Sequence, residues 1–133
     1  VLVRVLAASP RHPGANFHRA EALRRVGRKE EAIRSYRTAL AAQPGDPLLL
    51  HRLGNTYLDL NRLDEARGCF ETAVRAGRAT QGVLASYGIV SARQGRPQDA
   101  VRQWEEAIRL DPQSPMVPML QKQIADLRGR SRD

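Results

Sequence analysis

The sequence contains a single cysteine and no long run of hydrophobic residues. One cysteine excludes disulfides within the chain and any metal site built from several thiolates. The longest apolar stretch near the start covers residues 1–8 and is interrupted by Arg4, whereas a membrane-spanning helix needs about 20 apolar residues. This stretch does not have the form of a signal peptide either. We therefore expect no membrane insertion.

Residues that favour β-strands are also scarce. Val, Ile and Thr together number 17, against 18 Ala and 15 Leu, and this balance favours helices. A length of 133 residues corresponds to one domain, and the apolar content lies in the range of globular proteins. The sequence therefore predicts an all-α fold without strands.

Motifs for catalysis or metal binding are missing as well. The three histidines, His12, His18 and His51, lack the i, i+4 spacing and the accompanying Cys or Asp residues of metal sites. No nucleophile elbow, phosphate-binding glycine loop or Ser–His–acid grouping is present. Cys69 is interpreted as a small, partly buried apolar residue and is assigned no role. We expect no enzymatic activity, no catalytic residue, no metal and no cofactor.

What the sequence does contain is a repeat of 34 residues. The strings GRKEEA, NRLDEA and GRPQDA begin at residues 27, 61 and 95 and fall in register at this spacing. Small or apolar residues form the other aligned columns: Ala32, Ala66 and Ala100; Ala39, Ala73 and Ala107; Tyr36, Phe70 and Trp104; Ala20, Gly54 and Gly88; and Leu40, Val74 and Ile108. The period divides the chain into residues 1–12, three units at 13–46, 47–80 and 81–114, and a remainder at 115–133.

Each unit is expected to form two helices. In the middle unit, small and apolar residues recur three and four positions apart, which is the spacing of one helix face. These residues are Leu50, Leu53, Gly54, Tyr57, Ala66, Phe70, Ala73 and Val74. Between the two helices stands a residue type that accepts a left-handed conformation, namely Gly27, Asn61 or Gly95. Capping side chains predict further helix starts, at Asp46, Thr80 and Ser114.

These columns resemble the tetratricopeptide repeat, whose 34-residue unit follows the pattern W-x2-L-G-x2-Y, A-x3-F, A and P. The middle unit fits best and departs only at the leading aromatic and at the final proline, where Arg78 stands. The resemblance implies a right-handed α-solenoid of antiparallel helix pairs, with the first helix of each unit lining a concave face. The outer units fit less well in their first helices, where Ser91 occupies the Tyr position, so we expect looser packing there.

Both ends of the chain are interpreted within the same pattern. Residues 1–12 look like the second helix of a preceding repeat, so we expect further repeats upstream. Residues 115–133 are expected to form a capping helix followed by a frayed basic tail that starts at Arg128. The apolar stripe of this helix consists of Met116, either Met119 or Leu120, Ile124 and Leu127.

The resemblance also implies a partner-binding groove on the concave face. The residues at its inward-facing positions are Phe17, Glu21, Arg24, Arg25, His51, Arg52, Asn55, Leu58, Ile89 and Arg93. Residues 1–46 carry nine basic and four acidic side chains, so the groove is basic early and apolar late. Because guanidinium groups bind carboxylates with paired hydrogen bonds, we expect a peptide or helical segment of acidic character. Surface charge that serves solubility alone is the alternative.

Other functions stay open at this stage. Among the residues that correspond to the clamp for chaperone tails, only Arg52 suits a carboxylate, so this subtype is disfavoured. The net charge of +8 suits nucleic acid, but the aromatic residues other than Phe17 are assigned to the core, and we expect no nucleic-acid partner. The main expectation is a non-catalytic protein-interaction scaffold. The alternatives are a regulatory or substrate-presenting arm of a larger enzyme, for example a transferase, and a homo-oligomer that assembles through residues 1–6.

Overall fold

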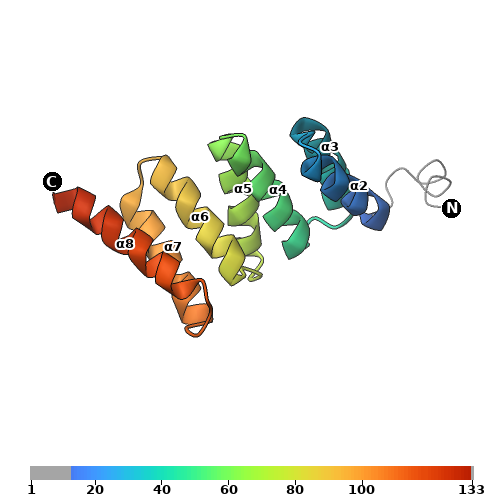
Figure 1. The fold of residues 1–133 in the computed structure, drawn as a ribbon. Helices are drawn as coiled ribbons and strands as arrows, with labels where there is room; N and C mark the ends of the chain where they lie inside the picture. The colour runs from blue at the N-terminus through green and yellow to red at the C-terminus, as the bar shows by residue number, and fades with distance from the viewer. Residues whose placement is uncertain (1–12, 133) are drawn as a thin grey trace.

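The computed structural model describes residues 13–132, and within this range seven α-helices and no strand are present. The helices are α2 (Pro13–Arg25), α3 (Lys29–Ala42), α4 (Pro47–Asp59), α5 (Leu63–Arg75), α6 (Gln81–Arg93), α7 (Pro97–Leu110) and α8 (Val117–Arg132). They follow one another along an elongated molecule (Figure 1). None of the described helices is both long and apolar enough to span a bilayer. The predicted all-α fold is confirmed.

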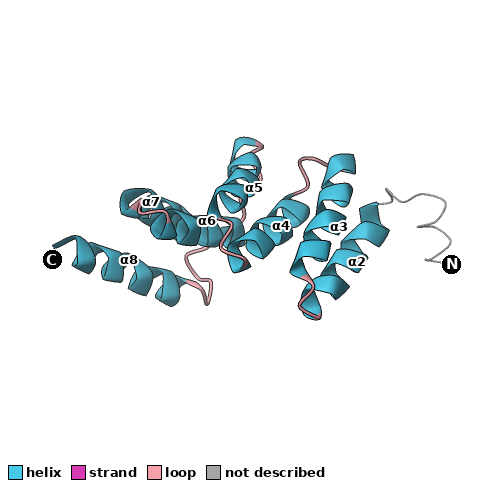
Figure 2. Ribbon diagram, turned by 90° about the horizontal axis from the view of Figure 1, so that it is seen from above, coloured by secondary structure: helices cyan, strands magenta, loops and turns pink. Residues whose placement is uncertain are grey.

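The helices pack as successive pairs, α2 with α3, α4 with α5 and α6 with α7. The first helices of the pairs begin at Pro13, Pro47 and Gln81, at intervals of 34 residues. Because α4 also contacts α6, the first helices lie along one side of the molecule, as Figure 2 shows. We call the surface formed by α2, α4, α6 and α8 the inner face, and that formed by α3, α5 and α7 the outer face. This arrangement is an α-solenoid of helical repeats.

Local sequence signals set where the helices begin and end. Gly27, Asn61 and Gly95 have φ angles of 84°, 57° and 75°, so each adopts the predicted left-handed conformation between the helices of its pair. The Asp46 carboxylate accepts hydrogen bonds from two N–H groups of the first turn of α4, at 2.9 and 3.1 Å. The Thr80 hydroxyl accepts one from the first turn of α6 at 3.1 Å. Both predicted caps are confirmed.

The two helices of a pair approach closely where a glycine faces an aromatic ring. A Cβ atom added to Gly54 would lie 2.5 Å from the buried ring of Phe70, and one added to Gly88 would overlap the indole of Trp104. The Trp104 Nε1–H donates a hydrogen bond to the Ala85 carbonyl at 3.0 Å, which fixes the indole against α6. The aromatic column is therefore a core column, as predicted.

Two expectations about packing are wrong. Val74 is 41% exposed, because it lies in the last turn of α5, one position beyond the buried Ala73. The first helix of the third unit does not pack loosely, since Ser91 is fully buried and its hydroxyl hydrogen-bonds the Gln103 amide at 2.7 Å. A small polar side chain with a buried partner thus replaces the tyrosine of the repeat pattern.

The last helix differs in part from the sequence expectation. Leu120 is fully buried whereas Met119 is 47% exposed, so Leu120 belongs to the stripe that packs towards α7. Residues 128–132, which were expected to be a frayed tail, continue α8 to Arg132. Basic residues at the C-terminal end of a helix are stabilised by its dipole, which explains why the helix extends. The predictions for residues 1–12, including self-association and His12, lie outside the described residues.

The glycine–ring contacts predict opposite effects for two glycine substitutions. Gly88→Ala should lower the free energy of unfolding by about 1–3 kcal/mol, because the new methyl group overlaps a fixed indole. An added Cβ at Gly68, within α5, meets no atom within 4 Å. Gly68→Ala should therefore raise the free energy of unfolding by up to about 1 kcal/mol through helix propensity. Urea unfolding followed by circular dichroism measures both, and equal effects would contradict the close contact.

Candidate functional site

All ten residues predicted for the groove lie on α2, α4 and α6, and hence on helices of the inner face. The structure gathers most of them into three groups. These are an arginine–glutamate cluster between α2 and α4, a histidine packed between α4 and α6, and an apolar strip that leads from α4 along α6 to α8.

A buried carboxylate organises the first group. Glu21 is only 8% exposed, and it accepts a hydrogen bond from the hydroxyl of Tyr36 on α3. Its carboxylate also lies 3.5 Å from Arg24 Nη2 and 3.5 Å from Arg52 Nε. Burial and then the hydrogen bond to Glu21 raise the pKa of Tyr36 to about 12, so the hydroxyl remains a donor at neutral pH. Glu21 therefore holds two guanidinium groups together, rather than facing outward as a separate charge.

Several polar atoms around this cluster have no hydrogen-bond partner. The buried Nε atoms of Arg24 and Arg52 and the buried Oδ1 atom of Asn55 are unpaired, although Arg52 Nε keeps its ion pair with Glu21. A buried polar atom without a hydrogen bond destabilises the folded state. The side chains of Arg24 and Arg52 are 31% and 39% exposed, so their outer nitrogens stay accessible to another molecule. The inner face thus holds hydrogen-bonding capacity that the described chain does not use.

His51 fills the space between α4 and α6. A Cβ atom at Gly82 would lie 2.7 Å from Cε1 of His51, so the absence of a side chain at Gly82 lets the imidazole approach α6. Burial, followed by the charge of Arg52, lowers the pKa of His51. The half-buried imidazole therefore packs in its neutral form.

The apolar strip ends in a pocket of about 300 Å³ between α6 and α8. Leu58 is buried, and its carbonyl accepts a hydrogen bond from Arg93 Nη1 at 3.5 Å. Ile89 and Arg93, both predicted for the groove, line the pocket together with residues of α8.

The contribution of α8 was not predicted. Gln123 lines the pocket, and its buried Oε1 atom has no hydrogen-bond partner. It continues the 34-residue column of inner-face residues formed by Glu21, Asn55 and Ile89. Extending this column into the last helix would have identified it. Tyr36 was also missed as a site residue, because it reaches Glu21 from the second helix of its pair.

Two predicted groove residues lie apart from these groups. Phe17 is half-buried and packs against the core, with its ring centroid 6.2 Å from that of Tyr36, so it is not a free aromatic surface. Arg25 is exposed in the last turn of α2 and, in the part of the chain that is described, makes no contact with the Glu21 cluster.

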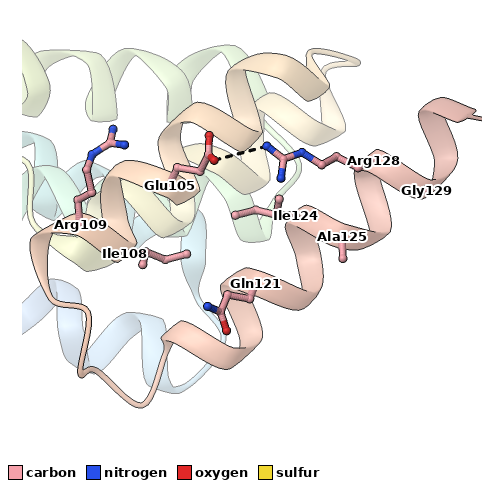
Figure 3. A pocket seen from close by; sticks show the side chains of 8 residues that line it. All are labelled: Glu105, Ile108, Arg109, Gln121, Ile124, Ala125, Arg128 and Gly129. Atoms are coloured by element: carbon pink, nitrogen blue, oxygen red, sulfur yellow. Dashed lines mark hydrogen bonds and ion pairs between the residues drawn. The ribbon is translucent and has the colours of Figure 1, made fainter.

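A larger cavity of about 720 Å³ lies between α7 and α8, away from the inner face (Figure 3). Arg128 extends from α8 across this cavity and donates a hydrogen bond to the Glu105 carboxylate at 3.4 Å. Since α8 packs mainly against α7, the cavity lies where the second helix of another pair would pack. Its facing charges already neutralise each other, so it offers less to a polar ligand than the inner face does.

The remaining reactive groups do not form a chemical centre in the described range. Between residues 13 and 132, no cluster of three His, Cys, Asp or Glu side chains has a metal-binding arrangement. Cys69 is 8% exposed, and burial raises the pKa of its thiol to about 12, so it is protonated and unreactive at neutral pH. The arrangement of the inner face is suited to binding.

The buried imidazole predicts a dependence of stability on pH. The contribution of neutral His51 should be fully present above about pH 6.5, the ordinary histidine pKa, and lost as the pH falls towards the lowered folded value. The loss should not exceed about 1.4 kcal/mol per pH unit, because one proton is involved. Urea unfolding above and below this pH measures the change. His51→Gln should reduce it, and an unchanged dependence would contradict neutral packing of His51.

The sequence and the fold both have known relatives. Residues 1–47 and 51–115 match the profile of the tetratricopeptide repeat family. The crystal structure of MamA superposes with a TM-score of 0.87 at 16% identity, over 98% of this chain and 75% of that chain. No curated protein sequence matches the chain closely enough to count as a relative.

Two other solved structures with this fold are described by the peptides they bind. YrrB, a TPR protein with an unusual peptide-binding site, gives a TM-score of 0.82 at 20% identity, over 98% of this chain and 66% of that chain. The first TPR of Spaghetti (RPAP3), bound to the HSP90 peptide SRMEEVD, gives 0.82 at 16% identity, over 91% and 94%. Identities this low establish the fold alone. With its family match over most of its length, the chain belongs to the tetratricopeptide repeat family.

Proposed function

We propose that the inner face binds a segment of another protein and that this segment carries carboxylates where it meets α2 and α4. The observation that carries the proposal is the group of unpaired polar atoms at Arg24, Arg52 and Asn55. Carboxylates and backbone groups of a bound segment would supply the hydrogen bonds that these atoms lack. The module acts by binding and performs no chemistry of its own.

The arginines of the outer face differ from those of the inner face in a way that supports this proposal. Arg62 hydrogen-bonds Glu65 and Glu30, and Arg67 hydrogen-bonds Glu71 and Gln94, so each guanidinium is used within the chain. Arg24 and Arg52 instead share the single carboxylate of Glu21, and their Nε atoms remain without hydrogen bonds. Positive charge available to a partner is therefore concentrated on the inner face.

The Glu21 carboxylate also indicates how the partner would bind. It already lies between two guanidinium groups, which is the position that a partner's Asp or Glu would favour. Glu21 thus acts as an internal competitor that weakens the attraction for an acidic segment. Peptide binding by YrrB and by the RPAP3 domain supports the choice of a peptide segment as the partner.

Removing the internal competitor should strengthen binding. Glu21→Gln keeps an oxygen that accepts the Tyr36 hydrogen bond but removes the negative charge between Arg24 and Arg52. An ion pair at this exposure is worth about 0.5–1 kcal/mol, so affinity for acidic peptides should rise about two- to fivefold. The probes are short peptides selected on the wild-type chain from a random phage-displayed library, and fluorescence polarisation measures their affinity.

Glu31→Gln is the matched control, because Glu31 is a similar glutamate on α3, ion-paired at 2.7 Å with Arg28. It changes the net charge equally and should leave the affinity unchanged. Arg52→Gln should weaken the selected peptides and reduce the dependence of their affinity on salt. Failure to select any peptide, or equal affinities for the Glu21 and Glu31 variants, would refute the proposed function.

A further inference from the structure

We infer that the pocket between α6 and α8 is an anchor site for one aliphatic side chain of a partner segment, followed in that segment by an acidic residue. This inference rests on the proposed function, and it adds the part of the partner that the α2–α4 cluster does not address. The pocket has a volume of about 300 Å³ and opens on the inner face beyond the arginine–glutamate cluster.

The inside of the pocket is apolar. Ile89 and Ala92 contribute from α6, Leu127 contributes from α8, and the Trp104 indole of α7 also lines the pocket. The indole N–H already donates to the Ala85 carbonyl, so Trp104 offers no free donor to a ligand. An aliphatic group placed there would bury apolar surface on all these side chains, which favours binding.

One polar atom in the pocket sets the orientation of the ligand. Gln123 Oε1 is buried and has no hydrogen-bond partner, so the pocket presents an acceptor. A ligand that satisfies it must donate a hydrogen bond, and the backbone N–H of a peptide is the donor nearest to an inserted side chain. An apolar pocket with one acceptor therefore fits a peptide residue better than a purely hydrocarbon ligand.

The charges around the pocket favour an acidic neighbour. Arg93 of α6 and Arg130 of α8 carry positive charge, and Asp126 carries the single negative charge among the lining residues. Arg93 reaches towards α4, where it contacts the Leu58 carbonyl at 3.5 Å, so its guanidinium lies between the pocket and the rest of the inner face. A carboxylate next to the inserted side chain would meet a net positive rim.

Three capped dipeptides test this assignment: Ac-Leu-Glu-NHMe, Ac-Gly-Glu-NHMe and Ac-Leu-Lys-NHMe. Methyl NMR on the full chain should show a saturable shift of the Ile89 methyl signals with the Leu-Glu probe. The Gly-Glu probe should give no saturable shift, because it lacks the aliphatic group, and the Leu-Lys probe should bind more weakly. Absence of a saturable Ile89 shift with Leu-Glu at the solubility limit would overturn the inference.

Gln123→Leu separates a ligand-binding role from a structural one. It removes the unpaired acceptor at similar size, so the Tm should stay at or above the wild-type value while the affinity for Leu-Glu falls about fivefold. Gln121→Leu is the matched control, because Gln121 lies on the same helix but lines the other cavity (Figure 3), and it should leave the affinity unchanged. A lower Tm with unchanged affinity for Gln123→Leu would overturn the inference.

The two proposals can fail separately. If selected peptides respond to Glu21→Gln but the Leu-Glu dipeptide leaves Ile89 unperturbed, the anchor site is wrong and the proposed function stands. If the dipeptide shifts Ile89 but no selected peptide distinguishes the Glu21 and Glu31 variants, the carboxylate site on α2 and α4 is wrong and the anchor site stands.

Discussion

The contact between a glycine on the first helix and an aromatic ring on the second sets the geometry of the helix pairs. At Gly54 and Gly88 the missing side chain leaves room for the rings of Phe70 and Trp104, so the two backbones approach closely. Repetition of nearly the same contact every 34 residues orients successive pairs alike. The inner face exists because of this repetition, since it brings α4 and α6 into contact.

Charge is distributed unequally between the two faces. On the outer face, arginines link neighbouring pairs: Arg62 bridges from α5 to Glu30 of α3, and Arg67 bridges from α5 to Gln94 and Asp99 beyond it. Arg67 also lies 5.2 Å from the centre of the Tyr87 ring, which adds a cation–π contact. These arginines hold the stack together. On the inner face the guanidinium groups of Arg24 and Arg52 have only Glu21 between them.

Much of the fold was predictable because its signals are local. The 34-residue columns, the left-handed residues Gly27, Asn61 and Gly95, and the caps Asp46 and Thr80 each act within a few residues of where they stand. The expectations that failed depended on packing against other elements. Val74 fits the repeat pattern but is exposed, and Ser91 departs from it but is buried.

The sequence by itself determined the helix pairs, their period and the family, since periodic apolar residues and turn residues act through backbone geometry and local burial. Only the tertiary structure decided what the inner-face side chains do. Whether Glu21 attracts a partner or occupies its own arginines depends on Tyr36, Arg24 and Arg52, which three different helices supply. In the same way, Gln123 joins the inner face only once α8 packs beside α6 and α7, because a pocket is formed by residues that folding alone brings together.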